Sequence, residues 1–127
     1  MDHTNLIDMK NTVSQDERFA KMFFGSVYPL YLAKIQKKGR TKAELDAVIS
    51  WLTGFDESMI QKMVDEKVNF ETLFQNATLH ANASKITGSI CGYKVQEIQN
   101  PLTQKVRYMD KLVDELAKGK DLEKIFR

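Results

Sequence analysis

The chain has few of the residues from which catalytic and metal sites are most often built. Its 127 residues include one cysteine, Cys91, and two histidines, His3 and His80. A single cysteine excludes an intramolecular disulfide, which fits a reducing compartment. A closed structural zinc site would need carboxylate ligands as well, and no ligand spacing is present. We therefore expect no metal and no cofactor.

Long apolar runs and a large excess of one charge are also missing. No run approaches the ~18 apolar residues that a membrane span needs, and the N-terminus lacks a signal-peptide pattern. We expect a cytoplasmic protein with no membrane partner. The 19 basic residues exceed the 17 acidic residues by two, so the net charge gives little indication of a nucleic-acid partner.

Helix signals are dense, and the clearest surround a glycine turn in the first half of the chain. Thr41 precedes Glu44 by three residues, which is capping-box spacing, and an apolar stripe at helical spacing follows over 45–52. Gly54 ends this helix, and Asp56 can cap the next one. Carboxylates at the start of that second helix would repel DNA phosphates. The pattern favours a packed helical hairpin over a DNA-recognition motif.

A helix over 29–38 and a longer helix over 101–118 are predicted to flank this hairpin. Pro29 suits a first helical position, because the residue before a proline is biased away from helical dihedrals. Asn100 can cap the longer helix, and the proline after it takes the first position, where no N–H is needed. We expect the helix over 101–118 to pack against 29–38 and 41–52.

Shorter helices capped by Asn69 and Asp121 complete the predicted set. Four aromatic residues are expected to form the core between the second helix and its successors: Trp51, Phe55, Phe70 and Phe74. On the long helix the charged residues are expected to form a solvated, salt-bridged face: Arg107, Asp110, Lys111, Asp114, Glu115 and Lys118.

Residues 85–95 fit two structures. Ser84 can cap a short helix that Gly92 stops, whereas β-branched residues on both sides of a glycine turn fit a small hairpin. We favour the helix, because no other segment offers a strand and an isolated hairpin is marginal.

These signals predict an all-α fold, a single compact domain of five to seven helices over residues 18–127. The alternative is an α+β fold with a small hairpin near 85–98. Residues 1–17 are polar and acidic, and we expect a flexible tail. The alternative is that Leu6, Ile7 and Met9 dock on a partner or a second subunit.

Several short blocks, in order along the chain, resemble a known bacterial family. The blocks are Ser26-Val27-Tyr28-Pro29, Lys38-Gly39-Arg40-Thr41-Lys42-Ala43-Glu44, Trp51-Leu52-Thr53-Gly54, Ile86-Thr87-Gly88, Cys91-Gly92, Asn100-Pro101-Leu102 and Arg107-Tyr108-Met109-Asp110-Lys111-Leu112. From about Met22 to Arg127 the chain is similar to the family catalogued as domain of unknown function 2200. The resemblance implies a small bacterial cytosolic protein of uncharacterised function, and it carries no catalytic residue over to this chain.

One surface feature points to a partner, a basic run without an intervening carboxylate. Its residues are Lys34, Lys37, Lys38, Arg40 and Lys42, with Tyr31 one helical turn before the first of them. A basic patch beside an aromatic ring can bind phosphate, RNA or an acidic protein surface. Cations near a helix C-terminus also stabilise the helix itself, and this structural interpretation is the alternative.

Cys91 is a weak candidate for a catalytic nucleophile. A reactive thiolate needs a nearby base, a cation or a helix N-terminus, and the nearest histidine in the sequence is His80. The alternative is a small buried residue between glycines that let backbones approach closely.

The sequence leaves three hypotheses about function. The first is a small non-enzymatic binding or protein-interaction module, whose partner is another protein or a second copy of the chain. The second is a nucleic-acid-associated protein that uses the basic loop 34–42. The third is an enzyme with Cys91 as nucleophile. The absence of a recognisable catalytic constellation favours the first.

Overall fold

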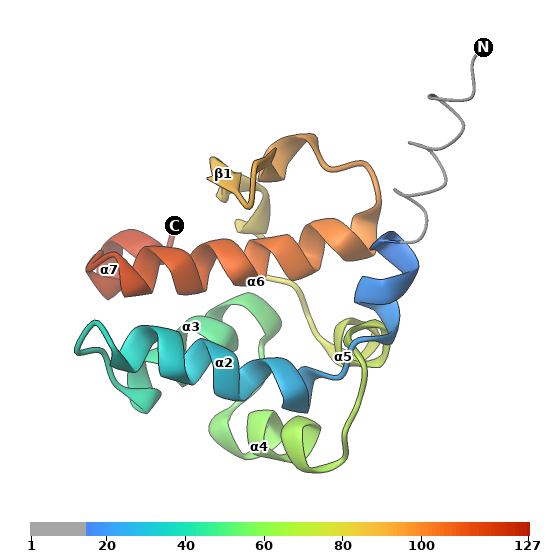
Figure 1. Ribbon diagram of the computed structural model, residues 1–127, viewed down its shortest axis with the longest axis horizontal. Helices are drawn as coiled ribbons and strands as arrows, with labels where there is room; N and C mark the ends of the chain where they lie inside the picture. The colour runs from blue at the N-terminus through green and yellow to red at the C-terminus, as the bar shows by residue number, and fades with distance from the viewer. Residues whose placement is uncertain (1–14) are drawn as a thin grey trace.

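The structure is a computed structural model that describes residues 15–127, so most of the predicted N-terminal tail lies outside the described residues (Figure 1). A helix over 15–21 is followed by α2 (Phe24–Gln36), α3 (Lys42–Thr53), α4 (Glu57–Asp65), α5 (Phe70–Asn76), η1 (Ala83–Lys85), β1 (Ser89–Ile90), β2 (Tyr93–Lys94), η2 (Val95–Glu97), α6 (Pro101–Ala117) and α7 (Leu122–Ile125). The predicted all-α class is confirmed, with a small hairpin added. None of the helices within residues 15–127 combines the length and apolar character that crossing a bilayer demands.

The long helix α6 is the element around which the others pack. It contacts α2, α3, α5 and α7, and on another side it contacts β1 and η2 (Figure 1). Its apolar stripe is buried at Val106, Met109, Leu112 and Leu116. The prediction that this helix packs against α2 and α3 is confirmed.

Local capping signals place the starts of α3, α4, α5 and α6 where the sequence predicts them. Asp121, the predicted cap of the last short helix, stands at the N-cap position but forms no side-chain cap hydrogen bond. The side chain of Thr41 accepts from the backbone N–H of Glu44, whose own side chain returns the bond, so the capping box is complete. The side chains of Asp56, Asn69 and Asn100 each accept from a backbone N–H three residues ahead, at 2.8 to 3.0 Å. These bonds satisfy donors that the helix itself leaves unpaired.

The predicted start of α2 at Pro29 is wrong, because the helix begins five residues earlier at Phe24. Phe24 is fully buried, and its backbone N–H donates to the carbonyl of Val68 at 2.9 Å. The helical N–H that proline lacks would have bonded to the carbonyl of Gly25, four residues back. Burial of the first turn outweighs that lost bond and the restraint on the residue before proline.

The preferred helix over 85–95 is also wrong, and the hairpin alternative is confirmed. β1 pairs antiparallel with β2, with Ser89 opposite Lys94 and Ile90 opposite Tyr93. The two turn residues, Cys91 and Gly92, have φ angles of 52° and 84°. A two-residue hairpin turn of type I′ requires such positive φ angles at both positions. The hairpin is not isolated, because β1 lies on α6 and its side chain Ile90 is buried.

The aromatic core is divided between two places. Phe70 stacks on Phe74 at 6.3 Å between ring centroids and meets Phe24 edge-on at 5.9 Å. Phe55 is buried as predicted. Trp51 is only partly buried, stacks on His80 at 4.2 Å and lies parallel to the ring of Phe126, so the prediction that it is one of the buried core residues is wrong.

Gly25 marks the closest approach between α2 and the end of α4. A Cβ added there would lie 2.8 Å from the carbonyl oxygen of Val64, a backbone atom that cannot move aside cheaply. We expect Gly25→Ala to lower the free energy of unfolding by about 1–3 kcal/mol, despite the helix propensity of alanine. Urea denaturation would measure this, with Ser26→Ala at the neighbouring exposed position as the control. Equal stability of the two variants would contradict the close packing.

Candidate functional site

The predicted basic run does not form one free patch, because several of its cations are paired within the protein. The ammonium of Lys34 lies 3.3 Å from a carboxylate oxygen of Asp114, and that of Lys42 lies 2.7 Å from Asp46. Lys37 and Lys38 are exposed and form no ion pair with any other residue in 15–127. These two lysines are the cations of the run that have no ion-pair partner within the described residues.

Arg40 links the turn after α2 to the turn after α6. Its guanidinium contacts the carboxylate of Glu44 at 2.8 Å, and Nη1 donates to the carbonyls of Leu116 at 3.3 Å and Lys120 at 2.9 Å. These carbonyls belong to the end of α6 and the turn beyond it, where the helix leaves acceptors unpaired. Arg40 therefore holds two turns together that are far apart in the sequence.

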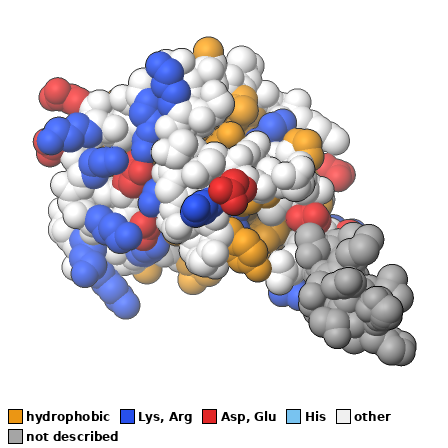
Figure 2. Space-filling model, turned by 90° about the horizontal axis from the view of Figure 1, so that it is seen from above, with side chains coloured by type: hydrophobic (Ala, Val, Ile, Leu, Met, Phe, Trp, Pro, Cys, Tyr) orange, Lys and Arg blue, Asp and Glu red, His pale blue; other side chains and the backbone are white. Residues whose placement is uncertain are grey.

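Exposed lysines from both turns lie at one end of the molecule (left in Figure 1). We call this surface the basic end and define it by Lys37, Lys38, Lys118 and Lys120. Figure 2 shows Lys and Arg side chains gathered at this end, on the left of the view, with some Asp and Glu side chains among them. The sequence places Lys118 and Lys120 about 80 residues from the others, so only the fold brings them together.

Asp114 on α6 is buried, and the prediction that it faces water is wrong. It is 9% exposed and binds two lysines, Lys118 at 2.9 Å and Lys34 at 3.3 Å. Burial alone would raise the pKa of this carboxyl, but hydrogen bonds from Lys118 and Lys34 outweigh it and lower the pKa below the usual 3.8. One negative charge therefore faces two positive charges.

Glu115, the next residue, is likewise buried against prediction and also bound by two cations. It is 7% exposed, and Arg127 holds it with two contacts of 2.6 and 2.8 Å. The ammonium of Lys120 lies 3.6 Å from the same carboxylate. Asn82 in turn donates to the backbone carbonyl of Arg127 at 2.7 Å, which fixes the last residue in place.

The two tyrosines near the basic run are buried and hydrogen-bonded to carboxylates. Tyr28 donates to Asp46 at 2.5 Å, and burial together with this carboxylate raises its pKa to about 12. Tyr31 donates to Asp110, and burial raises its pKa well above the usual value of 10.0. Neither ring is available to stack on a ligand at the surface.

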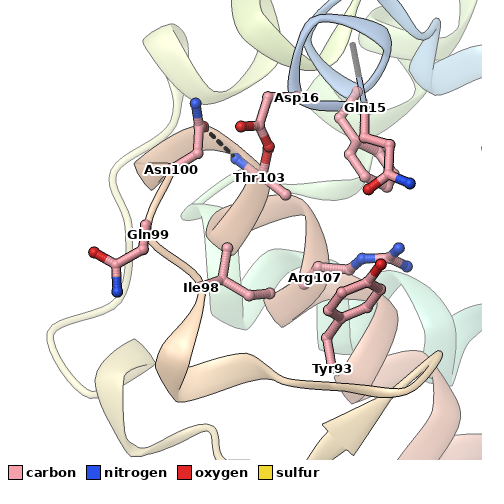
Figure 3. Close-up of a pocket in the computed structure, with 9 residues that line it drawn as sticks. Gln15, Asp16, Tyr93, Ile98, Gln99, Asn100, Thr103 and Arg107 are labelled. Carbon is pink, nitrogen blue, oxygen red and sulfur yellow. Dashed lines mark hydrogen bonds between the residues drawn. The ribbon is translucent and has the colours of Figure 1, made fainter. Parts of the chain in front are cut away.

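A cavity of about 170 Å³ lies between the helix over 15–21, β2, the segment before α6 and the first turns of α6 (Figure 3). Its lining is Gln15, Asp16, Phe19, Tyr93, Ile98, Gln99, Asn100, Thr103 and Arg107. A second hollow adjoins it, sharing Phe19, Tyr93 and Arg107 and adding Arg18 and Met22. The lining comes from three parts of the chain, and sequence reasoning did not find it.

Arg107 in this cavity is held between two aromatic rings and a carboxylate. Its guanidinium carbon lies 4.6 Å from the ring centroid of Phe19 and 6.0 Å from that of Tyr93, within cation–π range. Nη1 donates to Asp110 at 3.0 Å, and Asp110 also accepts from Tyr31. With a side chain 14% exposed, Arg107 is a largely buried, oriented cation.

No hydrogen bond joins Cys91 to His80 among the described residues. Cys91 is exposed at the tip of the hairpin turn, so its alternative interpretation as a buried residue is wrong. His80 stacks on Trp51, and its Nδ1 accepts from the backbone N–H of Asn82 at 2.9 Å. Within residues 15–127 no group of three or more metal-ligating side chains lies close enough to hold an ion.

Comparison with known proteins identifies the family. The profile of a bacterial family described as "Uncharacterized protein conserved in bacteria (DUF2200)" matches residues 18–127. The chain belongs to this family. The crystal structure of an uncharacterised protein, SP1917, is similar at 37% identity and a TM-score of 0.80, covering 86% of this chain and 90% of that one. No curated protein matches.

The lowered pKa of Asp114 makes a prediction about acid stability. A carboxyl whose folded pKa lies below its unfolded value stabilises the fold above the unfolded value, and this is lost as pH falls through the folded pKa. We expect Asp114→Asn to cost about 1 kcal/mol at pH 7, because its lysine partners are largely solvated. The difference from the unaltered protein should shrink below the usual pKa of 3.8.

Thermal unfolding followed by circular dichroism between neutral and acid pH measures this difference. Asp65→Asn is the matched control, because Asp65 is exposed on α4 and, within residues 15–127, forms one side-chain hydrogen bond, to the neutral Gln61 at 2.9 Å, and no ion pair. An Asp114→Asn difference that stays constant with pH would show that the ion pairs do not stabilise the fold.

Proposed function

We propose that this protein is a non-enzymatic binding module that docks an acidic surface of a partner protein on its basic end. The observation that carries the proposal is the convergence of the turns after α2 and α6, which Arg40 joins. The convergence places four exposed lysines on one surface, two from each turn. Such a surface attracts anionic partners and accelerates their encounter.

In the ion pairs at this end, the cations outnumber the carboxylates. Asp114 is bound by two lysines, and Glu115 is bound by a lysine and an arginine. Each carboxylate therefore cancels one of two cations. Lys37 and Lys38 have no ion-pair partner within residues 15–127 and add to this excess. An acidic partner would meet cations already held in place by buried carboxylates, which lowers the entropy cost of binding.

A nucleic-acid partner at the same surface is the second candidate, and the buried tyrosines weigh against it. Proteins that bind single strands without sequence preference combine a basic groove with aromatic rings on which bases stack. Tyr28 and Tyr31, the rings nearest the basic run, are 6% and 7% exposed and bonded to carboxylates. Only the phosphate attraction is left to support this candidate.

Binding of model polyanions tests the proposal. We expect poly-glutamate of about 20 residues to bind with salt-sensitive affinity. The double variant Lys37→Gln, Lys38→Gln should weaken binding about 2- to 30-fold, from the usual range for two surface ion pairs. Fluorescence anisotropy at low and physiological salt measures the affinity.

The matched control removes the same charge elsewhere. Lys62→Gln with Lys67→Gln changes two exposed lysines of α4 and the turn after it, and should leave the affinity unchanged. Equal loss in both double variants would mean that only net charge matters, against the proposed surface. A deoxythymidine strand of matched charge that binds tenfold more tightly than poly-glutamate would favour the nucleic-acid candidate.

The enzyme hypothesis through Cys91 is tested by the reactivity of the thiol. No hydrogen bond or ion pair within residues 15–127 connects Cys91 to a base or a cation. We expect its alkylation by iodoacetamide in the folded protein to proceed at the rate of the urea-unfolded chain at the same pH. A rate ten or more times faster in the folded state would reveal an activated thiolate and reopen this hypothesis.

A further inference from the structure

We propose that the cavity at Arg107 is a binding site for a small organic acid that carries one ring or branched aliphatic group. The carboxylate would bind the guanidinium of Arg107, and the apolar group would occupy the space between Phe19, Tyr93 and Ile98. Figure 3 labels Arg107, Tyr93 and Ile98 in the wall of this cavity. This site is separate from the basic end, and the inference does not depend on the function proposed for that surface.

The size and lining of the cavity set the apolar part of the ligand. A dry protein cavity of about 150 Å³ lined by apolar side chains is known to hold one benzene ring. The cavity here measures about 170 Å³ and has Phe19, Tyr93 and Ile98 in its wall. Tyr93 is 50% exposed although it belongs to β2, so one aromatic wall stands open to an incoming ligand. One ring-sized group therefore matches the space.

The hydrogen-bond donors of Arg107 indicate which charged group the ligand carries. A guanidinium has five N–H donors, and the one hydrogen bond that Arg107 donates within residues 15–127 goes from Nη1 to Asp110. No side-chain nitrogen among these residues is both fully buried and unpartnered. The remaining donors of Arg107 therefore reach solvent where the side chain lines the cavity. They present the planar fork that binds a carboxylate with two parallel bonds.

Arg107 is already oriented for such a ligand before one arrives. Asp110 fixes the guanidinium from one side, and Tyr31 fixes Asp110 by donating to its other oxygen. The rings of Phe19 and Tyr93 lie against the guanidinium. Since the rotamer is set by these contacts, little side-chain entropy is lost when a ligand binds.

Two carboxylates near the site need to be accounted for. Asp110 is used by Arg107 and Tyr31, as described. Asp16 also lines the cavity, and its Oδ1 accepts from the hydroxyl of Thr103 at 2.6 Å. Arg18 in the adjoining hollow adds a second cation beside Phe19. The Thr103 hydroxyl leaves the negative charge of Asp16 in place, and the Arg18 cation in the adjoining hollow offsets it.

Titration of the ¹⁵N-labelled full-length protein with 3-phenylpropanoate tests the inference. The Nε–Hε signal of Arg107, assigned by its loss in Arg107→Lys, should shift and saturate. The expected dissociation constant is about 1–10 mM, as befits a ligand of about a dozen heavy atoms. The uncharged amide of the same acid should bind at least tenfold more weakly, because it cannot accept the charged fork.

Variants separate the charged and apolar contributions. Arg107→Lys keeps the charge and loses the fork, and should weaken binding of the acid at least tenfold. Its affinity is measured from backbone amide signals around the cavity, because this variant lacks the Nε–Hε group. Tyr93→Ala removes a half-exposed wall and should weaken it at least threefold, which keeps the test valid if the arginine variant fails to fold. Lys105→Gln, which removes a cation from α6 outside this cavity, should change nothing.

Three outcomes would overturn the assignment. One is equal binding of the acid and its amide. Another is unchanged affinity in Tyr93→Ala and in any folded Arg107→Lys. The third is a tripeptide ending in phenylalanine with a free carboxylate that binds more than tenfold tighter than 3-phenylpropanoate, which would identify a protein C-terminus, and not a free acid, as the ligand.

Discussion

The structure depends on a row of carboxylates that α6 presents to the interior of the fold. Asp110, Asp114 and Glu115 lie on a helix packed on several sides, and each is bound by cations or a tyrosine hydroxyl from elsewhere. A carboxylate removed from water costs free energy unless charge and hydrogen bonds compensate it. The need to satisfy this row decides which side chains of α2, the turns and the C-terminal residues face α6.

Both candidate binding surfaces follow from this row. At one end of α6 the carboxylates of Asp114 and Glu115 collect cations from three segments and leave an excess of positive charge. Nearer the start of α6, Asp110 orients Arg107 beneath two aromatic rings at the wall of a cavity. The same interaction, a buried carboxylate paired with a cation, thus serves to hold the fold and to position groups that reach the surface.

The expected side-chain caps at four helix starts agree with the structure, and several expectations that depended on distant contacts do not. The capping box at Thr41 and the caps at Asp56, Asn69 and Asn100 depend on bonds within four residues. The start of α2 depends on contacts with the end of α4 and the residues after it, and a proline rule applied to neighbours alone misplaces it. The charged side of α6 was predicted to be solvated, because the i, i+4 spacing of charges does not show that α2 packs against that side.

The candidate site divides in the same way. The sequence shows the basic run, but not which of its cations form ion pairs. Lys42 pairs with Asp46, and Lys34 pairs with Asp114, which lies 80 residues away in the sequence. The cavity could not be predicted, because Phe19, Tyr93 and Arg107 belong to three segments whose spacing in sequence carries no common signal. The hairpin that brings Tyr93 to the site was itself one of two open alternatives.

The amino-acid sequence by itself determined the family, the helical class and the helix starts that depend on local caps, because these follow from periodic apolar spacing and from bonds between near neighbours. Only the tertiary structure decided the hairpin against α6, the burial of the α6 carboxylates, the assembly of the basic end and the cavity at Arg107. These features depend on the free energy of bringing charges and rings together from distant parts of the chain, which local patterns do not encode.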